Sequence, residues 1–253
     1  GCAPMSRPDL RAADEPRPIT VEIGIQHNPE GSVLYRCGGT AVLVSASIED
    51  GAPRWLEQPG HGWLTAEYQM HPRANRRRQQ REGRRGSIGG RTAEIQRLIG
   101  RALRSSIRLD RLGERVITID CDVLDADGGT RTASVTGGFI ALALALDGLK
   151  KKGKVRAGIL RSPVAAISVG LLNDAPLLDL CYAEDRDAEV DLNVVGTAEG
   201  AFVEVQGTAE GAPVPREHLD SMLDLALGSM PRLVAAQRLA LETAGADLDG
   251  LLG

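Results

Sequence analysis

The hydrophobic residues of this chain switch between two spacings, and the order of the switches restricts the fold. A period of two residues predicts strands, and a period near 3.6 predicts amphipathic helices. Strand-like segments come first and a helix follows, then a strand and a second helix, then several strands and a final helix. This order predicts a mixed α/β protein of the α+β type, with helices packed on mixed sheets.

The boundaries of these elements follow from turn residues and from the ends of the periodic segments. The expected strands are 18–26, 31–37, 40–49, 116–124, 164–172, 177–182, 192–195 and 201–206, and the expected helices are 92–109, 133–149 and 215–244. We expect residues 51–69 to be irregular apart from 61–67, and residues 228–231 to split or kink the final helix.

Several classes of protein are excluded by missing patterns. The chain has no Gly-x-Gly-x-x-Gly and no Walker-type lysine loop, so a dinucleotide-binding fold is not expected. No apolar run approaches the roughly 20 residues that cross a bilayer, and the N-terminus lacks a signal peptide's apolar core. We therefore expect a cytoplasmic protein with no membrane partner, with residues 1–6 as a flexible leader and residues 7–253 as the folded domain. The four cysteines are far apart, which argues against disulfides and zinc.

A glycine-rich turn, residues 125–134, stands between the fourth expected strand and the second helix. A glycine pair lets backbone N–H groups turn toward one point, and the helix N-terminus adds partial positive charge there. Arg131 can offer a bidentate fork to an oxyanion. Residues 129–131 are therefore a candidate phosphate site, although a tight turn with a capping threonine would give the same pattern.

A second arginine stands at a second helix start. Arg91 immediately precedes Thr92, which is a candidate cap for the helix. The buried face of this helix is marked by helical spacing of its apolar residues, Ile95, Leu98, Ile99, Ala102 and Leu103. If this helix start approaches residues 129–131, the two ends form one anion pocket.

Positive charge is concentrated in one part of an acidic chain. The net charge is −4, yet residues 71–115 hold 14 Arg, no Lys and 4 acids, a net of +10. Residues 71–90, here called the arginine loop, contain a single acid, Glu82. Arginine favours planar, bidentate phosphate contacts, so the segment indicates a nucleic-acid track. A solvated charged loop is the alternative explanation.

Four acids alternate along the segment that leads into a late strand: Asp185, Asp187, Glu189 and Asp191. In a fully extended segment this spacing would place all four side chains on one face. Their hard oxygen atoms suit Mg²⁺ or Mn²⁺, which would bridge to phosphate oxygens. A solvated acidic turn would look the same. Beside an arginine-lined phosphate pocket, the metal interpretation gives a coherent phosphoryl transfer.

Eight segments, in order along the chain, resemble ribonuclease PH, the bacterial phosphate-dependent 3′→5′ exoribonuclease. They are RAADEPRPIT, HGWLTAEYQMHPRA, GGRTAEIQRLIGRALR, GERVITIDCDVLDADGGTRTAS, VAAISVGLL, LLDLCYAED, EVDLNVV and FVEVQGTAEGAP, and they extend from about residue 7 to the final helix. The resemblance implies a ribonuclease PH-like fold, a single two-layer domain of βαβα units, and a homohexameric ring, a trimer of dimers.

The resemblance also implies an activity and its residues. Inorganic phosphate, the co-substrate, would attack the 3′-terminal phosphodiester of RNA, above all of tRNA precursors, and release nucleoside diphosphates. Asp185 and Asp191 would hold Mg²⁺ or Mn²⁺ and assist proton transfer. The implied phosphate-binding residues are Arg91, Gly129, Thr130 and Arg131. The expected RNA-binding residues are Arg73, Arg76, Arg77, Arg78 and Arg97.

The chain departs from the family pattern in places. Leu10 replaces a usual glycine in RPDLR, CGGT stands at 37–40, and GTAEGAF at 196–202 is unusual. The arginine loop differs most, which bears on RNA selectivity and ring contacts.

Two other functions stay open. A noncatalytic RNA-binding ring subunit would be expected to lose the aspartates or Arg131, and both are present. A hydrolytic nuclease would leave Arg91 and Arg131 without a co-substrate.

Overall fold

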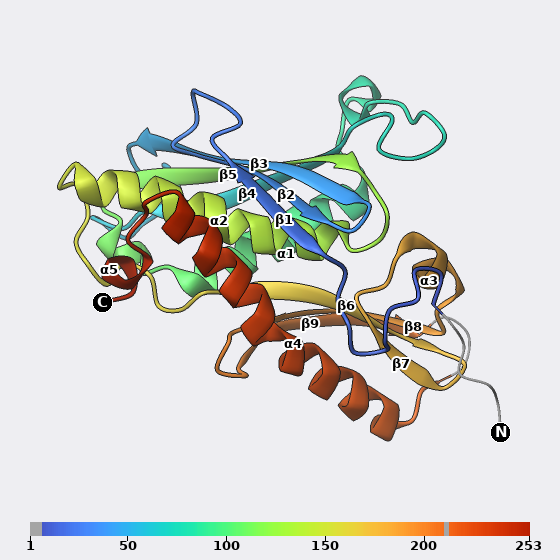
Figure 1. Ribbon diagram of the computed structural model, residues 1–253. Helices are drawn as coiled ribbons and strands as arrows, with labels where there is room; N and C mark the ends of the chain where they lie inside the picture. Colours follow the sequence, from blue (N-terminus) through green and yellow to red (C-terminus); the bar gives the residue numbers. More distant parts are fainter. Residues whose placement is uncertain (1–6, 210–212) are drawn as a thin grey trace.

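A computed structural model describes residues 7–209 and 213–253, with only the backbone described at residues 84 and 85 (Figure 1). The expected leader, residues 1–6, lies outside the described residues. Two sheets and the helices packed on them form the structure, so the predicted mixed α/β architecture is confirmed. The expectation of one catalytic domain over residues 7–253 stays a prediction.

The first sheet has five strands in the order β1-β2-β3-β5-β4. Only β4 and β5 pair in parallel, and the other neighbours are antiparallel. The strands are β1 (Ile19–Ile23), β2 (Gly31–Cys37), β3 (Thr40–Asp50), β4 (Trp63–Met70) and β5 (Arg115–Asp125). Within residues 51–69 we expected order only at 61–67, but the strand β4 continues to Met70, so the expected end of the ordered part was wrong. Leu64, Ala66 and Tyr68 alternate inward, and this buried face makes β4 a regular strand.

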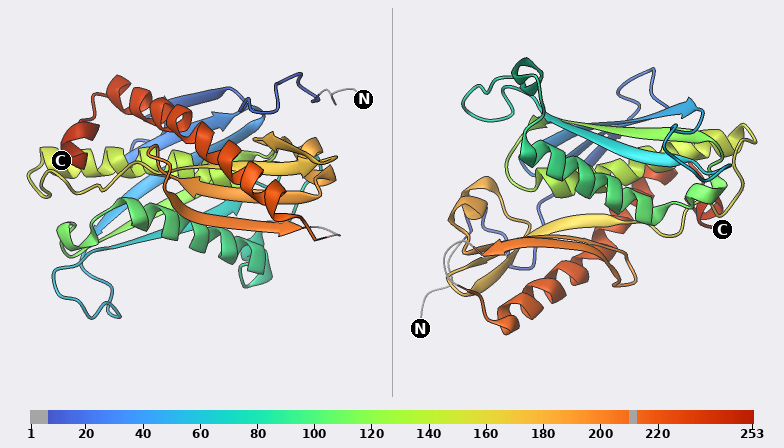
Figure 2. Two further views of the ribbon diagram at one scale, coloured as in Figure 1. Left: turned by 90° about the horizontal axis from the view of Figure 1, so that it is seen from below. Right: turned by 180° about the vertical axis from the view of Figure 1, so that it is seen from behind.

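Two helices cover one face of this sheet, α1 (Gly90–Ser106) and α2 (Thr130–Lys151). The predicted apolar face of α1 is buried, with Ile95 and Leu103 both 0% exposed. Helix α2 is apolar on nearly all sides because it contacts β2 and β3 of the first sheet and β6 of the second (Figure 2). By length and composition α2 could cross a membrane, but 89% of its apolar window is buried inside the protein, as in a core helix.

The second sheet is antiparallel, in the order β7-β6-β8-β9. Its strands are β6 (Ala165–Leu172), β7 (Ala175–Leu178), β8 (Val190–Gly196) and β9 (Phe202–Ala209). The long helix α4 (Arg216–Thr243) covers the outer face, so the layers alternate sheet, helices, sheet, helix, which makes four layers where two were expected (Figure 1). Helix α4 is not split at Pro231, which is exposed and lies inside one continuous helix. The short helices are η1 (Glu82–Arg85), η2 (Leu109–Arg111), α3 (Tyr182–Asp187) and α5 (Leu248–Leu252).

Candidate functional site

A cavity of about 450 Å³ lies between the two sheets, at the end of the molecule where α1 and α2 begin. The arginine loop and α3 lie at this same end (Figures 1 and 2). From the first-sheet side the lining comes from β4, the arginine loop, the start of α1 and the glycine-rich turn. From the second-sheet side it comes from β6, α3 and β8. The lining includes Tyr68, Glu82, Arg91, Thr92, Gly128, Gly129, Thr130, Arg131, Ser168, Tyr182, Asp185, Asp191 and Asn193.

Two helix N-termini meet at this cavity, as the sequence led us to expect. The N-cap of α1 is Gly89 and that of α2 is Gly129, and neither helix receives a side-chain cap. Among the residues that the structure describes, their first-turn N–H groups therefore have neither an intrahelical partner nor a side-chain cap, and both helix dipoles add positive potential. Neither threonine acts as the N-cap. Thr92 donates instead to Glu82 Oε1 at 2.8 Å, and Thr130 accepts from the Tyr68 hydroxyl at 2.9 Å.

The glycine pair of the turn meets a backbone requirement. Gly128 and Gly129 have φ values of 79° and 66°, in the left-handed region that favours glycine. A Cβ on Gly128 would lie 2.4 Å from the carbonyl oxygen of Leu180, in the loop that precedes α3. The turn thus packs directly against the second-sheet half of the site, and only glycine permits this approach.

Arg91 and Arg131 both line the cavity. Arg131 Nη2 donates to Glu94 Oε2 at 2.9 Å, while Arg131 Nε is buried without a hydrogen-bond partner among the described residues. Arg91 is exposed and lies at the start of α1. Both positive charges act to lower the pKa of Asp191, which shows that the arginines and this carboxylate share one electrostatic environment.

The acidic segment does not have the expected extended form. Residues 182–187 form the helix α3, so the four acids do not share one face. The cause is local: the Glu184 carboxylate accepts from the Cys181 N–H at 2.9 Å, in a capping box that favours a helical turn. Asp187 is exposed and pairs with Arg186, and Glu189 accepts from the Asn173 N–H. Asp185 from α3 and Asp191 from β8 are the two acids of this segment that line the cavity.

The environment of Asp191 fits a divalent cation. Burial raises the pKa of this carboxyl to about 6, and the charge of Asp185 acts in the same direction, against the opposing effects of Arg131, Asn193 and Arg91. Asp191 Oδ1 is buried and has no hydrogen-bond partner among the described residues. A cation bound to both carboxylates would offset the free-energy cost of burying the charged Asp191 close to Asp185. No group of three or more metal-ligating side chains occurs in the described part of the chain, so water and phosphate oxygens would complete the coordination of Mg²⁺.

The predicted RNA-binding arginines lie outside the cavity. Arg73, Arg97 and the triplet Arg76–Arg78 are exposed, the triplet on the arginine loop and Arg97 on α1. The loop reaches the cavity through different side chains, namely Asn75, Gln79, Gln80 and Glu82. Sequence reasoning attached no role to these four residues, nor to Tyr68, Ser168 and Asn193, because polar residues in strands and loops give no motif on their own.

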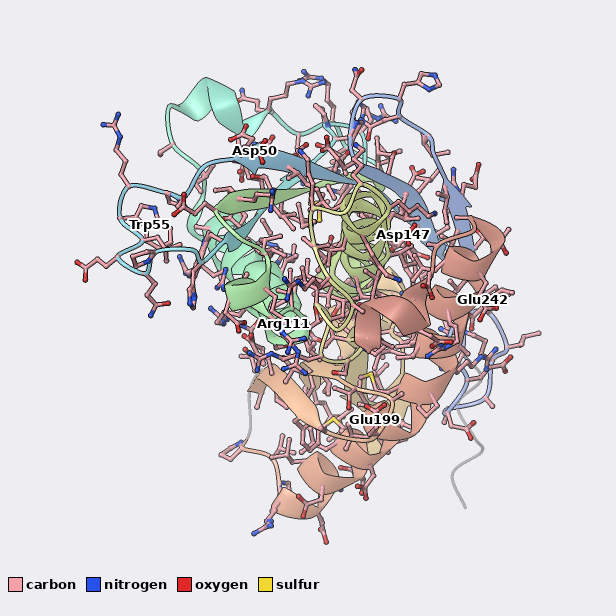
Figure 3. All side chains as sticks on the ribbon, turned by 90° about the vertical axis from the view of Figure 1, so that its left-hand side faces the viewer. Asp50, Trp55, Arg111, Asp147, Glu199 and Glu242 are labelled. Carbon is pink, nitrogen blue, oxygen red and sulfur yellow. The ribbon has the colours of Figure 1, made fainter. Side chains whose placement is uncertain are left out.

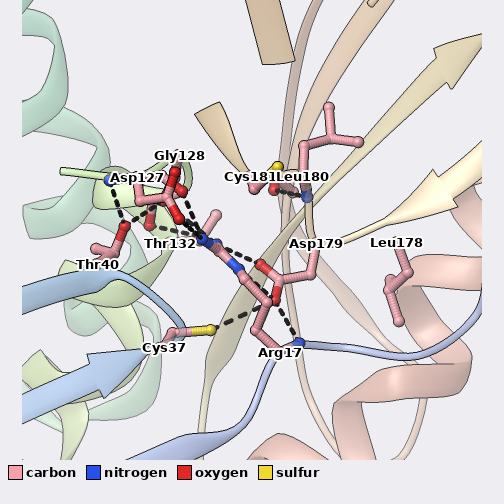
Figure 4. A network of polar contacts seen from close by, with 12 residues as sticks. Arg17, Cys37, Thr40, Asp127, Gly128, Thr132, Leu178, Asp179, Leu180 and Cys181 are labelled. Carbon is pink, nitrogen blue, oxygen red and sulfur yellow. Dashed lines mark hydrogen bonds and ion pairs between the residues drawn. The ribbon is translucent and has the colours of Figure 1, made fainter. Parts of the chain in front are cut away.

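A buried ionic network binds the backbone carbonyls of the glycine turn (Figure 4). Arg17 binds Asp179 through Nε at 2.9 Å and Nη2 at 2.7 Å, and both side chains are 3% exposed. Burial acts to raise the pKa of Asp179, but the hydrogen bonds and charge of Arg17 outweigh it and lower that pKa. Arg17 also donates to the carbonyls of Asp127 and Gly128, and Thr40 donates to Gly128 O at 2.6 Å. Sequence reasoning missed this network.

Solved structures of other proteins share this fold. Rice (Oryza sativa) Rrp46 has a TM-score of 0.75 at 20% identity, over 93% of this chain and 100% of that one. The Archaeoglobus fulgidus exosome with RNA bound to the active site gives 0.76 at 20% identity, over 91% and 92%. An archaeal exosome core gives 0.72 at 18% identity, over 92% and 91%.

Matches of the amino-acid sequence to two domains of one protein family show the family of this chain. Residues 15–146, which contain the first sheet and most of α2, match the 3′ exoribonuclease family, domain 1. Residues 162–229, which contain the second sheet and the first half of α4, match domain 2 of the same family. With the cavity placed between these two parts, the chain belongs to the ribonuclease PH family of 3′ exoribonucleases.

Proposed function

We propose that this protein is a phosphorolytic 3′→5′ exoribonuclease that uses inorganic phosphate to release nucleoside diphosphates from RNA. One observation carries the proposal: two uncapped helix N-termini, each with an arginine, share a cavity with a pair of carboxylates. An anion-binding half and a metal-binding half in one cavity suit the transfer of a phosphoryl group between two oxygen atoms. Hydrolysis by the carboxylates alone would give the arginine half no co-substrate to bind.

In the proposed reaction, phosphate lies against the N–H groups of residues 129–131, with Arg91 and Arg131 fixing its orientation. One of its oxygens attacks the phosphorus of the 3′-terminal nucleotide. The bond from that phosphorus to the 3′ oxygen of the preceding nucleotide breaks, and this oxygen takes up the proton that the attacking hydrogen phosphate gives up, with Asp185 or Asp191 assisting the transfer. Asp185 and Asp191 would hold Mg²⁺ or Mn²⁺, which supplies charge neutralisation on the scissile phosphate when bound. In the reverse direction, a nucleoside diphosphate extends the RNA and phosphate is released.

The direct test is incubation of a 3′-extended RNA with Mg²⁺, with and without phosphate, and separation of the nucleotide products. Diphosphates that form only with phosphate present are expected. Monophosphates formed without phosphate dependence would contradict phosphorolysis. Asp191→Asn should abolish turnover, whereas Asp187→Asn is the matched control, because Asp187 belongs to the same acidic segment but is exposed and does not line the cavity.

The substrate and assembly are finer parts of the proposal. We infer that the chain trims the 3′ ends of tRNA precursors in the cytoplasm, as a homohexamer built from three dimers. Family membership supports RNA as the substrate class, and the exposed arginines of the arginine loop supply positive charge for RNA. Light scattering gives the mass of the assembly. Competition between a tRNA precursor and an unstructured RNA of equal length measures the preference.

A noncatalytic RNA-binding ring subunit is the second candidate. It is favoured by the solved structures that share the fold, which are described as exosome structures and as Rrp46. This function predicts RNA binding without turnover in either direction, even with phosphate, metal and a correctly assembled oligomer. The assay described above separates the two candidates, because release of diphosphates excludes the noncatalytic one.

A further inference from the structure

The segment 7–17, here called the N-terminal strap, carries three arginines, and all three bind the loop that connects β7 to α3. Arg7 and Arg17 are buried, with 4% and 3% exposed. Arg7 Nη2 donates to the carbonyls of Leu178 and Asp179, and Arg11 Nη2 donates to the Asp179 carbonyl at 3.0 Å. No polar atom of the strap lines the cavity, yet its two ends bind the residues next to each half of the site.

The Arg17 end fixes the direction of two peptide groups in the glycine turn. Arg17 Nη1 and Nη2 donate to the carbonyls of Asp127 and Gly128. Every peptide bond in the described chain is trans, so the N–H of each peptide group points opposite to its carbonyl. Holding these two carbonyls on the Arg17 side therefore turns the N–H groups of Gly128 and Gly129 away from Arg17. Asp179 holds Arg17 in place through a two-point contact at 2.7 and 2.9 Å.

The Arg7 end fixes α3, which carries one of the two site acids. Arg7 Nε and Nη2 bind the two oxygens of Glu184 at 2.7 and 2.9 Å. Glu184 in turn accepts from the Cys181 N–H and so closes the first turn of α3. Asp185 is the next residue along the chain. The orientation of α3, and with it the position of the Asp185 carboxylate relative to Asp191, depends on this buried ion pair.

We propose that the N-terminal strap is a positioning element with two separable actions. The pair Arg17–Asp179 orients the Gly129 N–H, one of the groups that bind phosphate, and the pair Arg7–Glu184 positions α3 and therefore the Asp185 carboxylate of the metal-binding pair. The inference rests on the proposed function, because it assigns phosphate and metal to the two halves of the cavity. Buried ion pairs are costly to desolvate, and here their hydrogen-bonding fork gives a fixed geometry that an apolar pair of similar volume lacks.

The experiment compares Asp179→Asn with Glu184→Gln in the full-length protein. Each change removes one charge and keeps the side-chain shape. Asp179→Asn should raise the KM for phosphate by about tenfold or more and leave the Kd for Mn²⁺ within about twofold. Glu184→Gln should show the reverse, with Mn²⁺ binding weakened by about tenfold or more. Mn²⁺ binding is measured by electron paramagnetic resonance, and phosphate binding by the rise in melting temperature with phosphate concentration.

Asp147→Asn is the matched control, because Asp147 is a 5% exposed carboxylate of α2 that pairs with Lys151. Asp147 lies near the C-terminus of α2, whose N-terminus is at the cavity, and this end of the molecule faces the viewer in Figure 3. Its substitution should lower stability and change neither the KM for phosphate nor the Kd for Mn²⁺. If Asp179→Asn does not fold, Arg17→Lys, which keeps the charge but loses the fork, takes its place and is expected to raise the KM for phosphate.

Equal effects of both variants on phosphate and metal would overturn the inference and leave the strap a general stabiliser. Unchanged phosphate and metal binding in both variants would overturn it as well. Failure of the proposed function has a different signature: the wild-type protein itself would show no phosphate-dependent rise in melting temperature and release no diphosphate. That result removes the ligand that the inference assigns to the Arg17 end.

Discussion

Adding one methyl group to the glycine turn gives a sharp test of how the two halves of the site pack. Gly129→Ala places its Cβ 3.1 Å from Arg17 Nη2 and from Thr132 Oγ1, contacts that a movement of a few tenths of an ångström relieves. The loss of unfolding free energy then comes mainly from placing an alanine at a left-handed φ, which costs about 1–2 kcal/mol. The lower conformational entropy of the unfolded alanine variant offsets about 0.4–1 kcal/mol of this loss. Gly128→Ala carries the same backbone cost. Its Cβ also meets the Leu180 carbonyl oxygen at 2.4 Å, which is backbone and cannot yield cheaply.

Overpacking of this kind costs about 1–3 kcal/mol, which is the expected difference in unfolding free energy between the two variants. For a chain of this length, 1 kcal/mol corresponds to about 2–4 °C, so Gly128→Ala should melt about 2–12 °C below Gly129→Ala. Circular dichroism on both variants, under identical buffer, measures this difference. Equal melting temperatures would refute the reasoning, because they would mean that the turn does not pack against residues 180–182.

The remaining predictions concern single groups. Arg131→Ala should raise the phosphate concentration needed for half-maximal turnover by roughly 10- to 100-fold, since a charged hydrogen bond contributes about 1.5–3 kcal/mol; an unchanged requirement contradicts the assignment. Replacing the triplet Arg76–Arg78 with glutamine should weaken RNA binding with a shallower salt dependence, while turnover of a nucleoside diphosphate alone persists. Because the pKa of Asp179 is lowered on folding, its stabilisation is present above the unfolded value near 4 and is lost as the pH falls. Asp179→Asn should therefore lower the urea midpoint at pH 7, by a margin that shrinks below pH 4. Leu10 is 82% exposed at φ 63°, so Leu10→Gly should raise the melting temperature by up to about 4 °C.

Local patterns predicted most of the fold. The apolar spacing in α1 located its buried face, and the strand β2 has the expected limits, Gly31–Cys37. Residues 61–67 were expected to be ordered but were not assigned as the strand β4, because the loop before them is rich in glycine and proline and because the partner strand β5 is far along the chain. The alternation of Leu64, Ala66 and Tyr68 was the signal that could have located it.

The site was likewise predicted in part: its charged residues followed from motifs, whereas the contacts that position them did not. Arg91, Arg131, Asp185 and Asp191 were named from motifs, and the structure brings them to one cavity. The expected extended acidic segment failed because a capping box at Glu184 favours a helix over an alternating strand. Alternation alone cannot reveal such a side-chain contact with the backbone. The Arg17–Asp179 pair joins residues 162 positions apart, and no periodicity in one sequence marks such a partner.

The N-terminal strap also sets the order in which the molecule can be completed during synthesis. Arg7 and Arg17 leave the ribosome before their partners Glu184 and Asp179, which are 177 and 162 positions later in the chain. At about 5–20 residues per second, the strap waits roughly 8–35 s for these partners. The first sheet can form in that interval, whereas its glycine turn stays without the Arg17–Asp179 clamp until the β7–α3 loop has emerged. A nascent chain stopped before residue 179 should thus carry a folded sheet and an unfinished site.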